Sequence, residues 1–183
     1  MCLFAVPAHL PIENINEFYN GILHPLLVPA HLLTIITAGL LAGQQPSHTL
    51  LRSRIFMGAA AVGLILSALG VRIATPLPLI VYVLVIAIAV AARSERFPVF
   101  IVTLAPVPLG ILLGIDSAFD GLTTKGLVWS LLGCLLSVSF SSFYVALLVK
   151  KASRPWQHIA VRVAASWVTA ICLMVAALQF AQR

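Results

Sequence analysis

Long apolar runs separated by short polar stretches dominate the chain. A run of roughly 20 apolar residues is as long as a helix that crosses the hydrocarbon core of a bilayer, which is about 30 Å thick. The pattern therefore predicts an all-α membrane protein, a bundle of about six transmembrane helices in a single domain over residues 1–183. The six runs lie at about residues 22–43, 55–71, 77–92, 97–115, 126–149 and 158–180. The second and third are the shortest, and a helix of that length reaches only about 25 Å.

The segment before the first run has the pattern of an amphipathic helix. Between residues 11 and 22, apolar residues recur at helical spacing, glutamates and asparagines occupy the other side, and Pro11 suits a first helical position. We expect a short N-terminal interfacial helix that lies on the membrane surface. The first twenty residues contain no Lys or Arg and are interrupted by Pro7, so we expect no secretory signal there.

Composition supports a membrane protein and excludes two other classes. Hydrophobic residues make up 61% of the chain and charged residues 9%, which is too apolar for a soluble domain of 183 residues. The net charge of +6 would suit a nucleic-acid-binding protein, but the basic residues lie in short clusters between apolar runs. We therefore expect the lipid bilayer, and no nucleic acid, as the partner of this chain.

The basic residues indicate an orientation in the membrane. Loops that carry an excess of Lys and Arg remain in the cytoplasm. Because the basic clusters fall on alternate loops, we predict that both termini lie outside the cytoplasm in a multi-pass protein of the cell's inner membrane. Eight of the eleven basic residues lie on these loops: Arg52, Arg54, Arg93, Arg96, Lys150, Lys151, Arg154 and Arg162.

Small residues and prolines interrupt several of the runs. Glycines four residues apart let two membrane helices approach closely, and Pro106 and Pro108 predict a kink in the fourth run. We expect these glycines to serve helix packing. They form the pairs Gly39 with Gly43 and Gly110 with Gly114, and the second run adds Gly58, Gly63 and Gly70.

The stretch 21–44 contains the first candidate for chemistry. His24 is followed by Pro25, and His31 is followed by two leucines. This arrangement resembles the signature H-P-x-x-x-x-D-H-L-L of the HupE/UreJ family of multi-pass membrane proteins. The resemblance implies a permease-like protein that handles nickel or cobalt. One position departs from the signature, because Ala30 stands where the family has an acid.

A second signature of that family, H-G-x-A-H-G-x-E, is similar to residues 109–116. Gly110 and Gly114 match its glycines and Asp116 matches its acid, but Leu109 and Leu113 take the places of its two histidines. The resemblance thus implies a chain that keeps the packing pattern of the family and has lost half of its metal ligands.

The residues themselves give a set of candidate metal ligands. Nickel and cobalt accept imidazole and carboxylate ligands. In an unbroken helix, His24 and His31 would be about 10.5 Å apart. A residue before proline avoids the α conformation, so we expect the chain to be irregular at His24 and Val28, with a helix from Pro29 that lets His24 fold over His31. The candidates on the predicted outer side are His24, His31, Asp116 and Asp120, with Glu13 and Glu17 nearby.

Each candidate ligand also has a structural interpretation. The histidines would then be polar residues at a membrane interface or bonded to neighbouring backbone, and the aspartates would belong to a solvated outer loop. The positive end of a helix that begins at Pro29 disfavours a cation by about 0.3–1 kcal/mol, and Ala30 supplies no charge to counter it.

Two functional hypotheses follow. The first is a secondary permease for a divalent transition metal, with Ni²⁺ or Co²⁺ as the transported ion and no resident cofactor. The second is a non-transporting membrane subunit or assembly factor that keeps the fold, together with a membrane protein partner or a second copy of itself. We do not expect an enzyme, because no acid–base pair is placed at one depth and no nucleotide motif is present.

Overall fold

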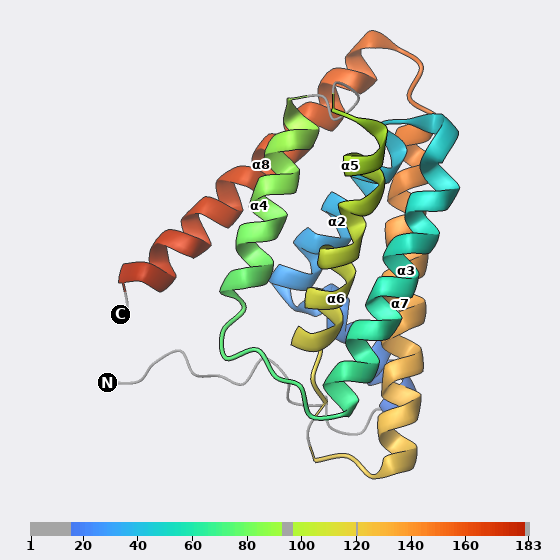
Figure 1. Ribbon diagram of the computed structural model, residues 1–183, viewed down its shortest axis with the longest axis vertical. Helices are drawn as coiled ribbons and strands as arrows, with labels where there is room; N and C mark the ends of the chain where they lie inside the picture. Colours follow the sequence, from blue (N-terminus) through green and yellow to red (C-terminus); the bar gives the residue numbers. More distant parts are fainter. Residues whose placement is uncertain (1–15, 93–96, 120, 182–183) are drawn as a thin grey trace.

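The protein is a bundle of helices. The computed structural model describes residues 16–92, 97–119 and 121–181, and within these ranges every regular element is helical, which confirms the all-α prediction (Figure 1). In chain order the elements are α1 (Glu17–Leu27), α2 (Pro29–Gly43), the short 3₁₀ helix η1 (Pro46–His48), α3 (Thr49–Ala68), α4 (Leu77–Ala91), α5 (Val99–Leu104), α6 (Pro106–Asp116), α7 (Thr124–Lys150) and α8 (Pro155–Ala181).

Several helices are long and apolar enough to cross a membrane. Four helical stretches meet this condition, α1 and α2 together form a fifth candidate, and α4 is a shorter apolar helix of 15 residues. The number of six spans remains a prediction. The four stretches are Pro46–Ala68, Val99–Asp116, Thr124–Lys150 and Pro155–Ala181.

The first predicted run is two helices instead of one. Val28 precedes a proline and has extended backbone (φ −82°, ψ 114°), so α1 ends there and α2 begins at Pro29, bent by 75° from α1. The predicted break at Val28 is confirmed. The predicted irregularity at His24 is wrong, because α1 continues through Pro25 to Leu27. Pro25 has no N–H to donate to the carbonyl of Gly21, so α1 lacks that one helical hydrogen bond.

The N-terminal helix packs within the bundle. Of its predicted range, residues 11–15 lie outside the described part of the chain, and α1 begins at Glu17. It lies along α7, where a Cβ added at Gly21 would clash with the backbone of Ser130 and one added at Gly133 would clash with Phe18. These glycines therefore let the two backbones touch.

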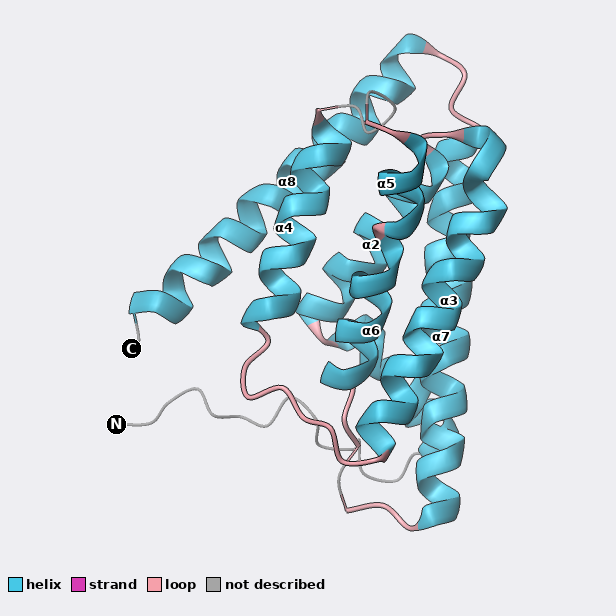
Figure 2. Ribbon diagram, in the orientation of Figure 1, coloured by secondary structure: helices cyan, strands magenta, loops and turns pink. Residues whose placement is uncertain are grey.

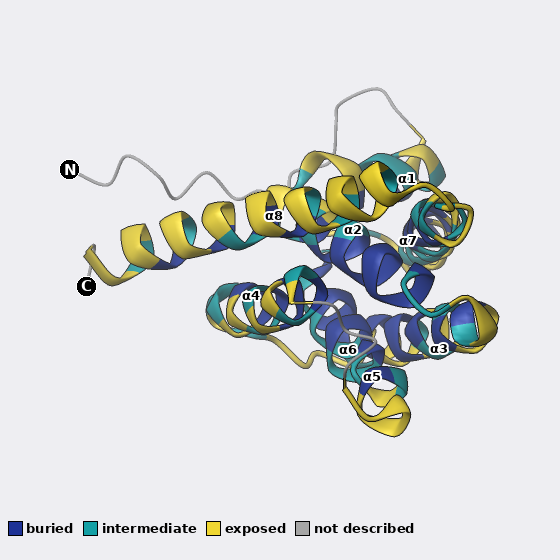
Figure 3. Cartoon of the chain, turned by 90° about the horizontal axis from the view of Figure 1, so that it is seen from above, coloured by how far each residue is buried: buried dark blue, intermediate teal, exposed yellow. Residues whose placement is uncertain are grey.

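Helix α2 lies at the centre of the bundle. It contacts α1, α3, α4, α6, α7 and α8, and ten of its fifteen residues are buried. Figure 3 shows this buried helix among its neighbours, whereas α8 runs outward with most of its surface exposed. Polar groups on α2 are thus enclosed by the other helices and are not exposed to lipid.

Glycine seams hold the long helices together, as predicted. A Cβ added at Gly110 would lie 2.7 Å from the backbone nitrogen of Ala60, and one added at Gly114 would lie 2.5 Å from that of Leu64, so α3 and α6 pack backbone to backbone. Gly39 and Gly43 serve the same purpose between α2 and α7. Gly58 and Gly70 do not serve packing as predicted, because no heavy atom lies within 4 Å of a Cβ added at either, and Gly70 follows the end of α3 with φ of 91°.

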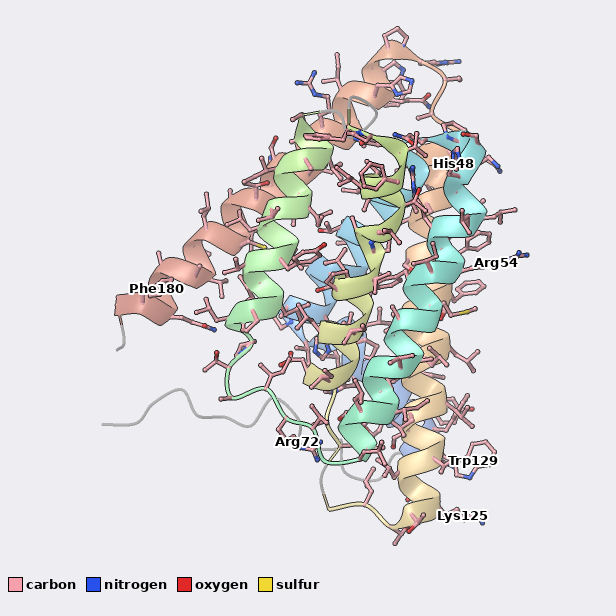
Figure 4. All side chains as sticks on the ribbon, in the orientation of Figure 1. His48, Arg54, Arg72, Lys125, Trp129 and Phe180 are labelled. Atoms are coloured by element: carbon pink, nitrogen blue, oxygen red, sulfur yellow. The ribbon has the colours of Figure 1, made fainter. Side chains whose placement is uncertain are left out.

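The helix ends that flank the three basic loops lie at the same end of the bundle. The ends of α2, α4 and α7 and the starts of α3, α5 and α8 lie there (Figure 2). We call this the Arg52 end, and the opposite end, where α6 stops at Asp116, the Asp116 end. Figure 4 labels His48 and Arg54 at the first and Arg72 and Lys125 at the second. That the Arg52 end lies on the cytoplasmic side of the membrane remains a prediction.

Candidate metal site

A contact between a histidine on α2 and an aspartate on α6 forms the core of the site. The Nε2 atom of His31 lies 2.9 Å from Oδ2 of Asp116, across a sequence separation of 85 residues. The His31 side chain is fully buried, and the Asp116 side chain is 12% exposed. An intramembrane histidine and carboxylate in contact are costly in lipid and mark a functional site in most membrane proteins.

The hydrogen bond to Asp116 determines which ring nitrogen of His31 is available. An ionised carboxylate only accepts hydrogen bonds, so Nε2–H of His31 donates to Asp116. In the neutral ring, Nδ1 then carries the lone pair. Nδ1 is buried and has no hydrogen-bond partner among the described residues. An unsatisfied buried polar atom costs about 1–3 kcal/mol, so packing alone does not account for this histidine.

His24 reaches the same place from α1. Its ring centroid lies 5.1 Å from that of His31 and 4.9 Å from that of Phe119, and the two imidazoles meet edge to face. His24 is 9% exposed. The bend at Val28 brings the two rings together, since seven residues of straight helix would hold them about 10.5 Å apart.

The ends of two helices meet at this contact. His31 lies in the first turn of α2, which has no side-chain cap, and Asp116 is the last residue of α6. A carboxylate is unfavourable at a helix C-terminus and favourable at an N-terminus, by about 0.3–1 kcal/mol in each case. Asp116 therefore supplies from α6 the negative charge that Ala30 does not supply at the start of α2.

None of the remaining sequence candidates that the structure describes joins this cluster. Asp120 and Glu13 lie outside the described residues. Glu17 lines a groove with Lys125 and Trp129, between α1 and α7. Leu109 and Leu113 are fully buried in the hydrophobic core. Within residues 16–92, 97–119 and 121–181, no group of three or more His, Cys, Asp or Glu side chains is arranged to hold a metal ion.

One comparison with known proteins identifies the chain. The family described as HupE / UreJ protein matches residues 1–175, nearly the whole length. The chain belongs to the HupE/UreJ family. No curated protein and no solved structure matched it significantly. It is therefore a membrane protein of this family, and His31 and Asp116, which lie in the two stretches that resemble the family signatures, touch in its fold.

Sequence reasoning missed a second polar cluster. Arg52 is fully buried, whereas Arg54, two residues further along α3, is exposed. Both arginines were assigned to a cytoplasmic loop, but α3 begins at Thr49, ahead of the predicted start at residue 55. Gln45 and Thr103 are polar residues that bond to Arg52 in the fold, and they are the only sign of this cluster that the sequence offers. Nothing in the sequence indicates that either residue lies next to Arg52.

Proposed function

We propose that the protein transports a divalent transition metal, nickel or cobalt, across the membrane, and that His31 and His24 bind the ion near Asp116. The observation that carries the proposal is the contact between His31 and Asp116. A carboxylate that accepts a hydrogen bond from one ring nitrogen of a histidine orients the other nitrogen towards a metal and raises its basicity. His31 Nδ1 is the nitrogen so oriented.

The separation of the two imidazoles supports the same proposal. Metal–nitrogen bonds of about 2.0–2.1 Å and tetrahedral angles place the centroids of two histidine rings that share an ion about 5 Å apart. The observed separation of His24 and His31 is 5.1 Å. Two imidazoles with water in the remaining positions form a weak, open site, and weak binding is what a transported ion requires, because it must leave again.

Binding of Ni²⁺ and Co²⁺ to the purified protein tests this proposal. We expect His31→Ala to weaken binding more than tenfold in equilibrium dialysis, and uptake into proteoliposomes to fall with it. His158→Ala is the matched control, since His158 is exposed at the Arg52 end. The proposal is wrong if the wild type binds neither ion, or if His31→Ala binds as the wild type does.

A specific observation favours a second function, that of a non-transporting membrane subunit or assembly factor. Leucines fill the core at positions 109 and 113, and the described residues hold no three-ligand group. A stable stoichiometric partner recovered from membranes with the protein, together with absent metal binding, would support this function. A monodisperse protein that takes up metal without a partner would rule it out.

A further inference from the structure

Arg52 is a buried arginine with neutral partners. Its Nη2 donates to Oε1 of Gln45 at 2.5 Å, and both Nη2 and Nε lie 3.4 Å from Oγ1 of Thr103. Its Nη1 is buried without a hydrogen-bond partner. No carboxylate in the described part of the chain pairs with it, although the side chain is 0% exposed.

Stability does not account for this arrangement. A buried charge without a counter-ion costs several kcal/mol, and an apolar side chain of similar size usually costs nothing. The rule that basic residues collect on cytoplasmic loops does not explain it either, because such residues lie in water or at the headgroups, as the exposed Arg54 does. An ionisable group held inside a membrane bundle points to function.

Arg52 lies at the opposite end of the bundle from the contact between His31 and Asp116. Helices α3 and α6 run parallel, because Gly110 packs on Ala60 and Gly114 on Leu64. Asp116 follows Gly114 by two residues, while Arg52 precedes Leu64 by twelve, so the two charges are separated by about 20 Å along the axis at 1.5 Å per residue. Gln45, which holds Arg52, follows the C-terminal end of α2, and His31 lies in the first turn of the same helix.

One unsatisfied polar atom lies at each of these two ends and a third lies between them on α2. His31 Nδ1, Thr37 Oγ1 and Arg52 Nη1 are all buried and have no partner among the described residues. Thr37 lies on α2, six residues beyond His31. Buried polar groups normally bond to protein or to ordered water, so this succession is suited to a hydrated ion that passes along α2.

We infer that Arg52 is an electrostatic gate that closes the far end of the metal path. The inference rests on the proposed function. In a low-dielectric interior a guanidinium repels a divalent cation strongly, and a fixed arginine excludes cations from a pore by this means. Gln45 and Thr103 hold the guanidinium across the end of α2, where the negative end of the helix dipole favours it. An ion bound at His31 stays there until Arg52 moves.

Proteoliposomes with an entrapped dye that Co²⁺ quenches test the gate. We expect Arg52→Gln, which removes the charge, to raise Co²⁺ entry at least fivefold over the wild type. Arg52→Lys, which retains the charge, and Arg54→Gln, which removes an exposed arginine from the same helix, should both behave as the wild type. Entry in Arg52→Gln equal to that of Arg54→Gln, or slower, would overturn the inference.

A second variant keeps the test decisive if Arg52→Gln fails to fold. Thr103→Asp places a carboxylate beside the guanidinium and neutralises it without removing the arginine. Faster Co²⁺ entry in Thr103→Asp supports the gate, and entry unchanged from the wild type overturns it.

Binding measured on the same samples separates the gate from the proposed function. If Arg52→Gln binds Co²⁺ as the wild type does and admits it faster, both proposals hold. Equal binding with equal entry overturns the gate alone. A wild type that binds no Co²⁺ overturns the metal site at His31, and the ratio of entry rates between Arg52→Gln and Arg54→Gln still decides the gate.

Discussion

The two ends of α2 hold charged groups in opposite circumstances. At the Asp116 end a carboxylate and an imidazole are in contact, and a second imidazole packs against the pair. At the Arg52 end a guanidinium is fully buried and, among the residues that the structure describes, has only an amide and a hydroxyl for partners. If charges in this bundle served stability alone, both ends would be paired. The difference is consistent with the proposals that one end attracts a cation and the other repels it.

The largest expected effect concerns the paired end. Asp116→Asn keeps the shape and removes the charge that orients His31, so affinity for Ni²⁺ should fall about 10–100-fold, equivalent to about 1.4–2.7 kcal/mol. Equilibrium dialysis measures this change. An affinity that matches the wild type would mean that Asp116 does not act on the metal through His31.

The second prediction concerns the glycine contacts between α3 and α6, which fix the distance between Arg52 and Asp116. Gly110→Ala places a Cβ 2.7 Å from backbone and side-chain atoms of α3, so it should lower the free energy of unfolding by about 1–3 kcal/mol. Gly58→Ala on the same helix pair meets no atom within 4 Å and should stabilise the helix by about 0.5–1 kcal/mol. Thermal unfolding in detergent compares the two, and equal effects would contradict the close packing of α3 on α6.

The sequence predicts more of the Asp116 end than of the Arg52 end. The apolar runs and Pro29 predicted the helices and the break that brings His24 to His31. The contact of His31 with Asp116 spans 85 residues and depends on how α2 and α6 pack, which local patterns do not specify. Arg52 was missed for a related reason: an arginine near the start of a span resembles a loop charge, and only the packing of α3 against α5 buries it.

The third prediction concerns a histidine introduced at the Asp116 end, where the sequence resembles a family signature that has a histidine. Leu113 lies one turn before Asp116 on α6, at a position where the family signature has a histidine. Leu113→His should raise Ni²⁺ affinity about tenfold, or about 1.4 kcal/mol, by adding a third imidazole to the site. Unchanged or weaker binding in the same dialysis experiment would show that this face of α6 does not reach the ion.

The smallest expected effect concerns the unpaired end. Arg52→Met removes a charge whose burial is costly together with its hydrogen bonds to Gln45 and Thr103, and because these two effects offset each other the free energy of unfolding should change by no more than about 1 kcal/mol, in either direction. Thermal unfolding in detergent measures it, with Arg54→Met as the control. A fall of several kcal/mol in the free energy of unfolding would mean that Arg52 stabilises the fold. The two ends would then no longer differ in the purpose of their buried charges.

The metal's own coordination tests the central claim most directly. Ni K-edge X-ray absorption on the purified, nickel-loaded protein reports the ligands around the ion. We predict scattering from two histidine imidazoles at about 2.0–2.1 Å, with one of them lost in His31→Ala. A wild-type spectrum without imidazole scattering, or one unchanged in His31→Ala, would contradict the assignment of the metal site to His31.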